Sequence, residues 1–204
     1  TLRPHYGKAL FNLGRIHYEQ HQLKEAAEYF KKACTEADMD DDAGFSAWGM
    51  TAMEIRDFDS AIQAYSKAFA YAPANNEYLS HLAHAYLYKR DLDKAGYYMK
   101  MLYQREPGNP QAILGMGELY IMTKEFKKAL DMFNQALPYA KQFPDIELRM
   151  VSCHYKRGNM DGSMHHLRKF LALNTNPQLT KRAQAILTAL ETKNYDYPAL
   201  AWWK

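Results

Sequence analysis

The side chains best suited to metal or acid–base chemistry in this chain are its histidines. His81 and His84 lie three residues apart, a spacing that places two imidazoles on one side of a helix and can hold a metal. A metal site needs further ligands, and no cysteine or second spaced pair stands nearby, so we interpret both as ordinary histidines. The adjacent pair His165 and His166 points about 100° apart on a helix and cannot act as a dyad without outside partners.

The run from Asp38 to Asp42 resembles the start of a calcium loop. Such a loop needs Gly at its sixth position and Glu at its twelfth, where this chain has Ala43 and Gly49. We therefore expect a solvated turn whose last aspartate, Asp42, caps the next helix. No phosphate-binding Gly-rich loop, nucleophile elbow or spaced carboxylate pair occurs in a sequence context that would support catalysis. The chain is predicted not to be an enzyme and to use no metal or cofactor.

Two cysteines, Cys34 and Cys153, lie too many elements apart to pair, so both are predicted to be reduced core thiols. Reduced thiols are compatible with a cytosolic location, which we favour. The formal net charge is +3, and basic residues do not gather into a face that would indicate nucleic acid. No apolar stretch approaches the roughly 18–20 residues that span a bilayer, so no membrane insertion is predicted.

The elements that position these residues are predicted to be helices. The sequence contains 27 Ala and 21 Leu but only 7 Ile and one Val, a composition that argues against sheets. A small residue after a bulky one recurs at Gly14, Gly49, Ala83 and Gly117, at spacings of 35, 34 and 34. Two further series keep the same register: Ala26, Ala61, Ala95, Ala129 and Ser163, and Phe30, Tyr65, Met99, Phe133 and Leu167. A period of 34 residues is typical of a repeated helical hairpin.

Each period is predicted to be a helix–turn–helix hairpin, because its apolar residues follow helical spacing on both sides of a polar break. Aspartates after the break are expected to cap the second helix: Asp59, Asp93 and Asp161. Pro73 and Pro107 are expected to stop that helix, and Pro138 should end the corresponding helix early in the fourth unit.

At these positions the sequence resembles the tetratricopeptide repeat (TPR) family, as in Trp48-Gly49, Ala61, Tyr65, Ala68 and Pro73. The resemblance implies an all-α, right-handed superhelical solenoid of five hairpins plus a C-terminal capping helix. We place the solenoid at 1–192 as a single domain, with repeats at 7–40, 42–75, 76–109, 110–143 and 144–177, the capping helix at 178–192 and an aromatic tail at 193–204.

The family places its partners in a concave groove lined by the first helix of each hairpin. Projected onto this chain, that groove consists of Phe11, Asn12, Arg15, Tyr18, Ser46, Ala47, Met50, Met53, Ser80, His81, His84, Leu87, Tyr88, Leu114, Glu118, Met122, Arg149 and Tyr155. Small floor residues and soft methionines favour contact with an apolar peptide or helix. The carboxylate clamp with which some family members grip acidic C-termini is absent, since its positions in the first three units hold Phe11, Arg15, Ala47, Glu77 and His81.

We therefore predict a non-catalytic scaffold or adaptor that binds a segment of another protein. Two alternatives remain open at this point: a dedicated chaperone for an apolar segment of a secreted or membrane-inserted client, and a self-assembling structural oligomer. The tail is predicted to be an attachment segment that docks on its own solenoid or on another chain through Tyr195, Tyr197, Trp202 and Trp203.

Overall fold

The computed structural model describes residues 4–36, 41–143, 145–174 and 176–194, and within these ranges all regular structure is helical. The predicted aromatic tail, 195–204, lies outside the described residues. No helix in the described part is long and apolar enough to cross a membrane. Inter-residue contacts divide the chain into two compact units, Thr1–Pro107 and Gly108–Lys204. Each unit is described by itself below.

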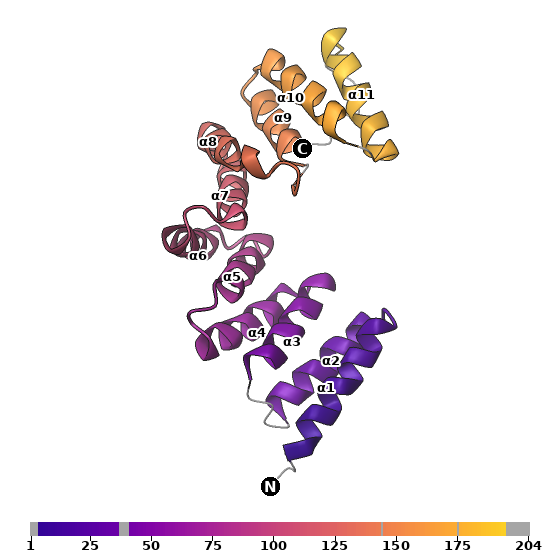
Figure 1. Ribbon diagram of the computed structural model, residues 1–204, viewed down its shortest axis with the longest axis vertical. Helices are drawn as coiled ribbons and strands as arrows, with labels where there is room; N and C mark the ends of the chain where they lie inside the picture. The colour runs from indigo at the N-terminus through magenta and orange to yellow at the C-terminus, as the bar shows by residue number, and fades with distance from the viewer. Residues whose placement is uncertain (1–3, 37–40, 144, 175, 195–204) are drawn as a thin grey trace. The chain divides into compact units, whose positions relative to one another are not determined.

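Unit 1 is built from six helices that pair in chain order (Figure 1). The pairs α1–α2, α3–α4 and α5–α6 form hairpins, and α2 packs on α3 as α4 packs on α5. The helices are α1 (Pro4–Glu19), α2 (Leu23–Thr35), α3 (Asp42–Glu54), α4 (Phe58–Tyr71), α5 (Asn76–Tyr88) and α6 (Leu92–Arg105).

Unit 2 continues the pattern with the hairpins α7–α8 and α9–α10, followed by α11, which packs on α10 (Figure 1). As Pro138 predicts, the second helix of the first hairpin ends early, at Ala136, and a 3₁₀ turn follows. The elements are α7 (Pro110–Met122), α8 (Phe126–Ala136), η1 (Leu137–Tyr139), α9 (Ile146–Lys156), α10 (Met160–Leu173) and α11 (Pro177–Glu191).

One backbone turn joins the two helices of every hairpin. Its central residue has a positive φ, for example 62° at Arg56 and 74° at Gly158. The next residue donates its backbone N–H to the carbonyl five residues back, as Asp57 does to Ala52 at 2.8 Å. His21, Arg90 and Lys124 hold the same place in the other hairpins. Most of these residues are not glycine, so the turn accepts the cost of a left-handed backbone in order to reverse the chain sharply.

The small residues of the 34-residue period lie where the helices of a hairpin cross. A Cβ atom added to Gly14 would lie 2.7 Å from the Phe30 ring, and one added to Gly49 would lie 2.8 Å from Tyr65. Gly117 faces Phe133 in the same way. The glycines therefore let an aromatic ring of the second helix rest directly on the backbone of the first, which explains why the two series keep one register.

The predicted helix caps are wrong by one or two residues. The side chains that accept the free N–H groups belong to Asp57, Asp91 and Asn159, two positions before the predicted Asp59, Asp93 and Asp161. Asp41 caps α3 through Gly44 N at 2.6 Å, in place of Asp42. For the three caps within hairpins the turn explains the shift, because the residue after the positive φ still has non-helical dihedrals and is the one that can cap.

Candidate functional site

A hollow opens between α1 and α3 in unit 1, with a volume of about 160 Å³. α1 and α3 are the first helices of neighbouring hairpins, so the hollow lies on the face where the sequence predicts a groove. Five of the predicted groove residues line it, together with Glu19, Phe30 and Thr51. The lining consists of Phe11, Arg15, Tyr18, Glu19, Phe30, Ala47, Met50 and Thr51.

The floor of the hollow is apolar. Phe11 packs against Phe30 of α2, with ring centroids 5.2 Å apart. Ala47 contributes only a methyl group, and the Thr51 hydroxyl donates to the Ala47 carbonyl at 2.8 Å. Because that hydroxyl is already bonded within α3, the floor offers no unsatisfied polar group to an incoming side chain. Met50 stands over this floor with 44% of its surface exposed.

The rim of the hollow carries charge. The Arg15 and Glu19 side chains lie 3.9 Å apart and are 60% and 70% exposed, so their pairing is weak and both remain accessible. Tyr18 donates a hydrogen bond to Glu54 of α3, which closes one side of the hollow. This bond, together with partial burial, raises the pKa of the Tyr18 hydroxyl, so it stays a donor at neutral pH.

The remaining predicted groove residues of unit 1 divide by burial. Ser80 and Leu87 are 4% and 1% exposed and therefore lie beneath the surface. His81 stacks on Tyr65 with ring centroids 5.0 Å apart, and partial burial followed by the neighbouring His84 lowers the pKa of His81. The surface-accessible members are Asn12, Ser46, Met53, His81, His84 and Tyr88.

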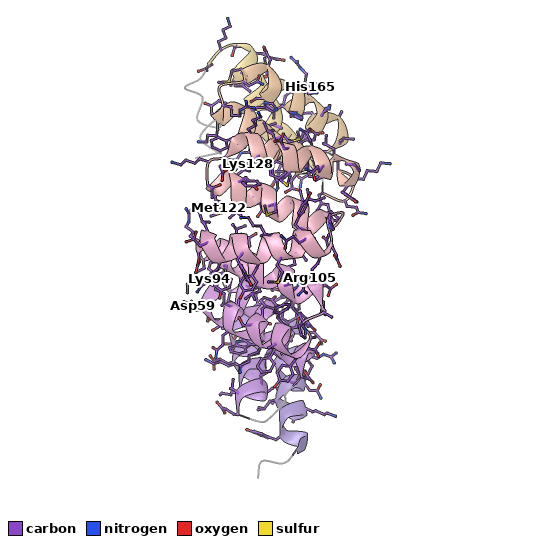
Figure 2. The ribbon with its side chains drawn as sticks, turned by 90° about the vertical axis from the view of Figure 1, so that its left-hand side faces the viewer. Asp59, Lys94, Arg105, Met122, Lys128 and His165 are labelled. Carbon is purple, nitrogen blue, oxygen red and sulfur yellow. The ribbon has the colours of Figure 1, made fainter. Side chains whose placement is uncertain are left out.

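In unit 2 the predicted groove residues contact one another. Arg149 Nε donates to Asp145 Oδ2 at 2.8 Å, and the Arg149 guanidinium also pairs with Glu118 of α7. Burial by itself lowers the pKa of Arg149, but the two carboxylates outweigh this effect and hold the pKa above its ordinary value. Leu114 is 9% exposed, and Tyr155 packs against the apolar core. Met122, labelled in Figure 2, ends α7 and is half-buried.

Sequence reasoning missed a buried polar cluster between α9 and α10. His166 Nδ1 lies 2.6 Å from Glu147 Oε2, and both residues are less than 10% exposed. The His154 ring stacks on His166 at 5.1 Å. The position of His166 next to Leu167 of the periodic apolar series could have indicated that it is buried. Its partner Glu147 could not be identified in the same way, because it lies nineteen residues away. Among the described residues, no three His, Cys, Asp or Glu side chains are grouped to hold a metal.

Both cysteines are buried, as predicted for core thiols. Burial raises the pKa of the Cys153 thiol to about 12. The thiolate fraction at neutral pH is therefore very small, and Cys153 is a packing residue with little nucleophilic character.

Three tetratricopeptide repeat family profiles match the chain, over residues 7–38, 46–110 and 87–147. Among curated proteins, the CTR9 homologue of Arabidopsis thaliana is 22% identical over 179 residues, which cover 84% of this chain and 16% of that protein. Human tetratricopeptide repeat protein 21A is 28% identical over 85 residues, 42% of this chain and 6% of that protein. The chain thus spans less than a fifth of these relatives.

Solved structures show the same fold. A TPR protein of Thermus thermophilus superimposes with a TM-score of 0.68 at 19% identity, covering 89% of this chain and 99% of that one. A tetratricopeptide repeat protein of Parabacteroides merdae gives 0.75 at 20% identity, covering 96% and 76%. The repeat period, the helical hairpins and these matches agree, and proteins built this way are in general non-catalytic interaction scaffolds. The chain belongs to the tetratricopeptide repeat family.

Proposed function

We propose that unit 1 binds a segment of another protein on its first-helix face, and that the hollow between α1 and α3 receives one large apolar side chain of that segment. The observation that carries this proposal is the combination of an apolar floor, an exposed methionine and an accessible charged rim in one place.

The size of the hollow favours a side chain over a free small molecule. Pockets for small ligands usually measure about 300–1,000 Å³, and this one measures about 160 Å³. A hollow of that size is suited to an anchor residue, the kind of contact that dominates protein interfaces. Met50 has an unbranched, polarizable side chain and can adjust to the shape of the anchor.

The rim supports recognition of polar residues beside the anchor. Arg15 and Glu19 present one charge of each sign, and neither is held in a strong pair. A partner segment with an acidic residue on one side of its anchor and a basic residue on the other would complement this rim. The acidic C-terminus that a carboxylate clamp binds would meet Glu19 as well as Arg15, so the rim does not favour it.

The fold likeness agrees with a role of this kind. A chain of the APC/C hetero-tetramer Cut9–Hcn1 superimposes with a TM-score of 0.72 at 17% identity, covering 91% of this chain and 37% of that one. That chain therefore belongs to an assembly of two different proteins. At this identity the likeness concerns the fold alone, and the binding site in this chain is argued from its own hollow.

The test uses peptides selected from a random displayed library on the full chain, with affinity measured by fluorescence anisotropy. We expect Met50→Glu to weaken the selected peptides at least about tenfold, which corresponds to about 1.4 kcal/mol. Gln63→Glu is the matched control, because it adds the same charge to an exposed position of α4 outside the hollow. Equal affinity for wild type and Met50→Glu, with the control also unchanged, would refute the proposed site.

A further inference from the structure

The chain leaves α11 through the turn that joins the two helices of every hairpin. Lys193 has a φ of 55°, close to the 59° to 74° found at the other five turns. Asn194 donates its backbone N–H to the Ala189 carbonyl at 2.8 Å, the same five-residue bond that Asp57 makes to Ala52. Lys193 follows Gly158 by 35 residues, which continues the repeat period. The positive-φ residues that precede it are His21, Arg56, Arg90, Lys124 and Gly158.

In the five hairpins this turn sends the chain back along the helix it has just left. The residue after the positive φ occupies the N-cap position, which Asp57, Asp91 and Asn159 fill with capping side chains. Asn194 stands at the corresponding place, and asparagine is among the best capping residues. The turn at Lys193 and Asn194 therefore directs the chain back along α11.

α11 has an open face on that path. Its opposite face is covered, since Ala183, Ile186 and Leu190 share an apolar cluster with Leu167 and Phe170 of α10. The open face forms a hollow of about 490 Å³, and Asn194 itself belongs to its lining. The lining residues are Lys181, Gln184, Ala185, Thr188, Ala189, Thr192 and Asn194.

The sequence beyond Asn194 has large apolar residues at two positions where the second helices also have them. Tyr195 comes one residue after the cap, where the hairpins have Leu23, Phe58, Leu92, Phe126 and Met160. Trp202 comes eight residues after it, where the hairpins have residues no more than 3% exposed: Phe30, Tyr65, Met99, Phe133 and Leu167. Pro198 stands where the hairpins have the small residue of the 34-residue period, and it lacks the backbone N–H that Ala61 donates to the Asp57 carbonyl at 3.0 Å.

We propose that residues 195–204 dock in the hollow on α11 of their own chain, with Trp202 as the anchor. Ten residues reach at most about 33 Å, which exceeds the length of about 22 Å expected for the 15-residue α11. The covalent link at Asn194 gives the tail a high effective concentration at this hollow, so it outcompetes the tail of a second copy. The contact covers the open face of α11 and does not depend on the site in unit 1.

Acrylamide quenching of tryptophan fluorescence tests this contact directly. The chain has three tryptophans, and Trp48 is 1% exposed, so accessible fluorescence reports on Trp202 and Trp203. We expect Ala185→Arg, which fills the hollow, to raise the quenching constant at least about twofold, toward that of a synthetic peptide of residues 193–204. Gln178→Arg is the matched control, because it adds the same charge to an exposed residue of α11 outside the hollow.

Deletion of residues 195–204 provides a second readout that does not rely on the substituted helix. Amide exchange in α11 should then accelerate about tenfold, while exchange in α3 of unit 1 stays the same. The proposal is overturned if the wild-type tail is quenched as strongly as the free peptide, or if the deletion leaves α11 exchange unchanged. It is also overturned if protection appears only at high protein concentration, since that result would place the tail on another copy.

Discussion

The same repeat positions serve opposite purposes in the two units. Arg15 of α1 and Glu118 of α7 share one position of the period, and so do Asn12 and Arg149. In unit 1 the arginine is 60% exposed at the rim of a hollow. In unit 2 the corresponding glutamate is bound by Arg149, which Asp145 also holds. In unit 1 these charges of the first-helix face are therefore exposed, whereas in unit 2 they hold α7 to α9.

The hairpin crossings differ in a related way. In unit 1 the backbone at Gly49 touches the ring of Tyr65. In the α9–α10 hairpin of unit 2, Val151 and Leu167 replace this pair, and the Ser163 hydroxyl donates to the Val151 carbonyl at 3.2 Å. The buried Glu147–His166 pair lies between the same two helices. The helices of one hairpin thus cross through a glycine and an aromatic ring, and those of the other through polar contacts. The stability of the two hairpins should respond differently to substitution.

The largest effect is expected from breaking the polar crossing in unit 2. His166→Leu leaves the Glu147 carboxylate buried without its partner, and such a loss costs about 3 kcal/mol of unfolding free energy. The double variant Glu147→Leu with His166→Leu should recover most of this loss, because two apolar side chains need no partner. Urea denaturation measures both. A single variant as stable as wild type would show that the pair does not hold the hairpin.

In unit 1 the hairpin crossing should lose stability through steric crowding. Gly49→Val places new atoms within contact of the Tyr65 ring and should cost about 2 kcal/mol. Adding Tyr65→Leu recreates the Val–Leu pair of unit 2 and should restore part of the stability. A double-mutant cycle in urea gives the coupling between the two sites. Additive losses would mean that the ring and the glycine do not form one packing unit.

A smaller contrast is expected between the two arginines. Arg149→Gln leaves Glu118, whose side chain is 19% exposed, without its charged partner and should cost about 1.5 kcal/mol. Arg15→Gln should cost less than about 0.5 kcal/mol, because its pair with Glu19 is exposed. Thermal and urea unfolding of both variants measure the difference. Equal losses would remove the distinction between an open and a self-paired face.

The smallest effect concerns acidification. Burial, followed by the neighbouring His166, lowers the pKa of His154 below its unfolded value of about 6.5. The neutral form is therefore favoured in the folded state, and this contribution to stability is complete above about pH 6.5 and is lost as the pH falls below it. His154→Gln should reduce the loss of amide protection in α9 between pH 7.5 and 5.5. His81→Gln should do the same for α5 in unit 1, since the pKa of His81 is also lowered. Unaltered profiles would show that neither ring contributes.

Much of the fold could be predicted from residue spacing alone. The small residues recur every 34 residues because they lie where the two helices of a hairpin cross closely. The caps of the second helices could not be placed correctly, since a left-handed residue such as Arg56 precedes each of them and gives no compositional signal. On the first-helix face, Phe11 and Met50 were predicted and line the hollow. The burial of Leu87 depends on packing against neighbouring helices, which one sequence position does not report.

The pairing of charges was the least predictable feature. Glu118 and Arg149 are 31 residues apart, and whether two such side chains meet depends on the angle between their helices. The Glu147–His166 pair is hidden for the same reason. These contacts decide which part of the first-helix face is free, so the extent of the candidate site emerged only with the three-dimensional arrangement.

Methyl NMR of methionine-labelled protein tests the central claim most directly, because each unit contributes a methionine to its first-helix face. A library-selected peptide is titrated into the full chain while the Met50, Met53 and Met122 methyl signals are followed. We predict saturable shifts of Met50 and Met53 with the dissociation constant found by anisotropy, and no shift of Met122. Shifts of Met122 without any change at Met50 would contradict the assignment of the binding site to unit 1.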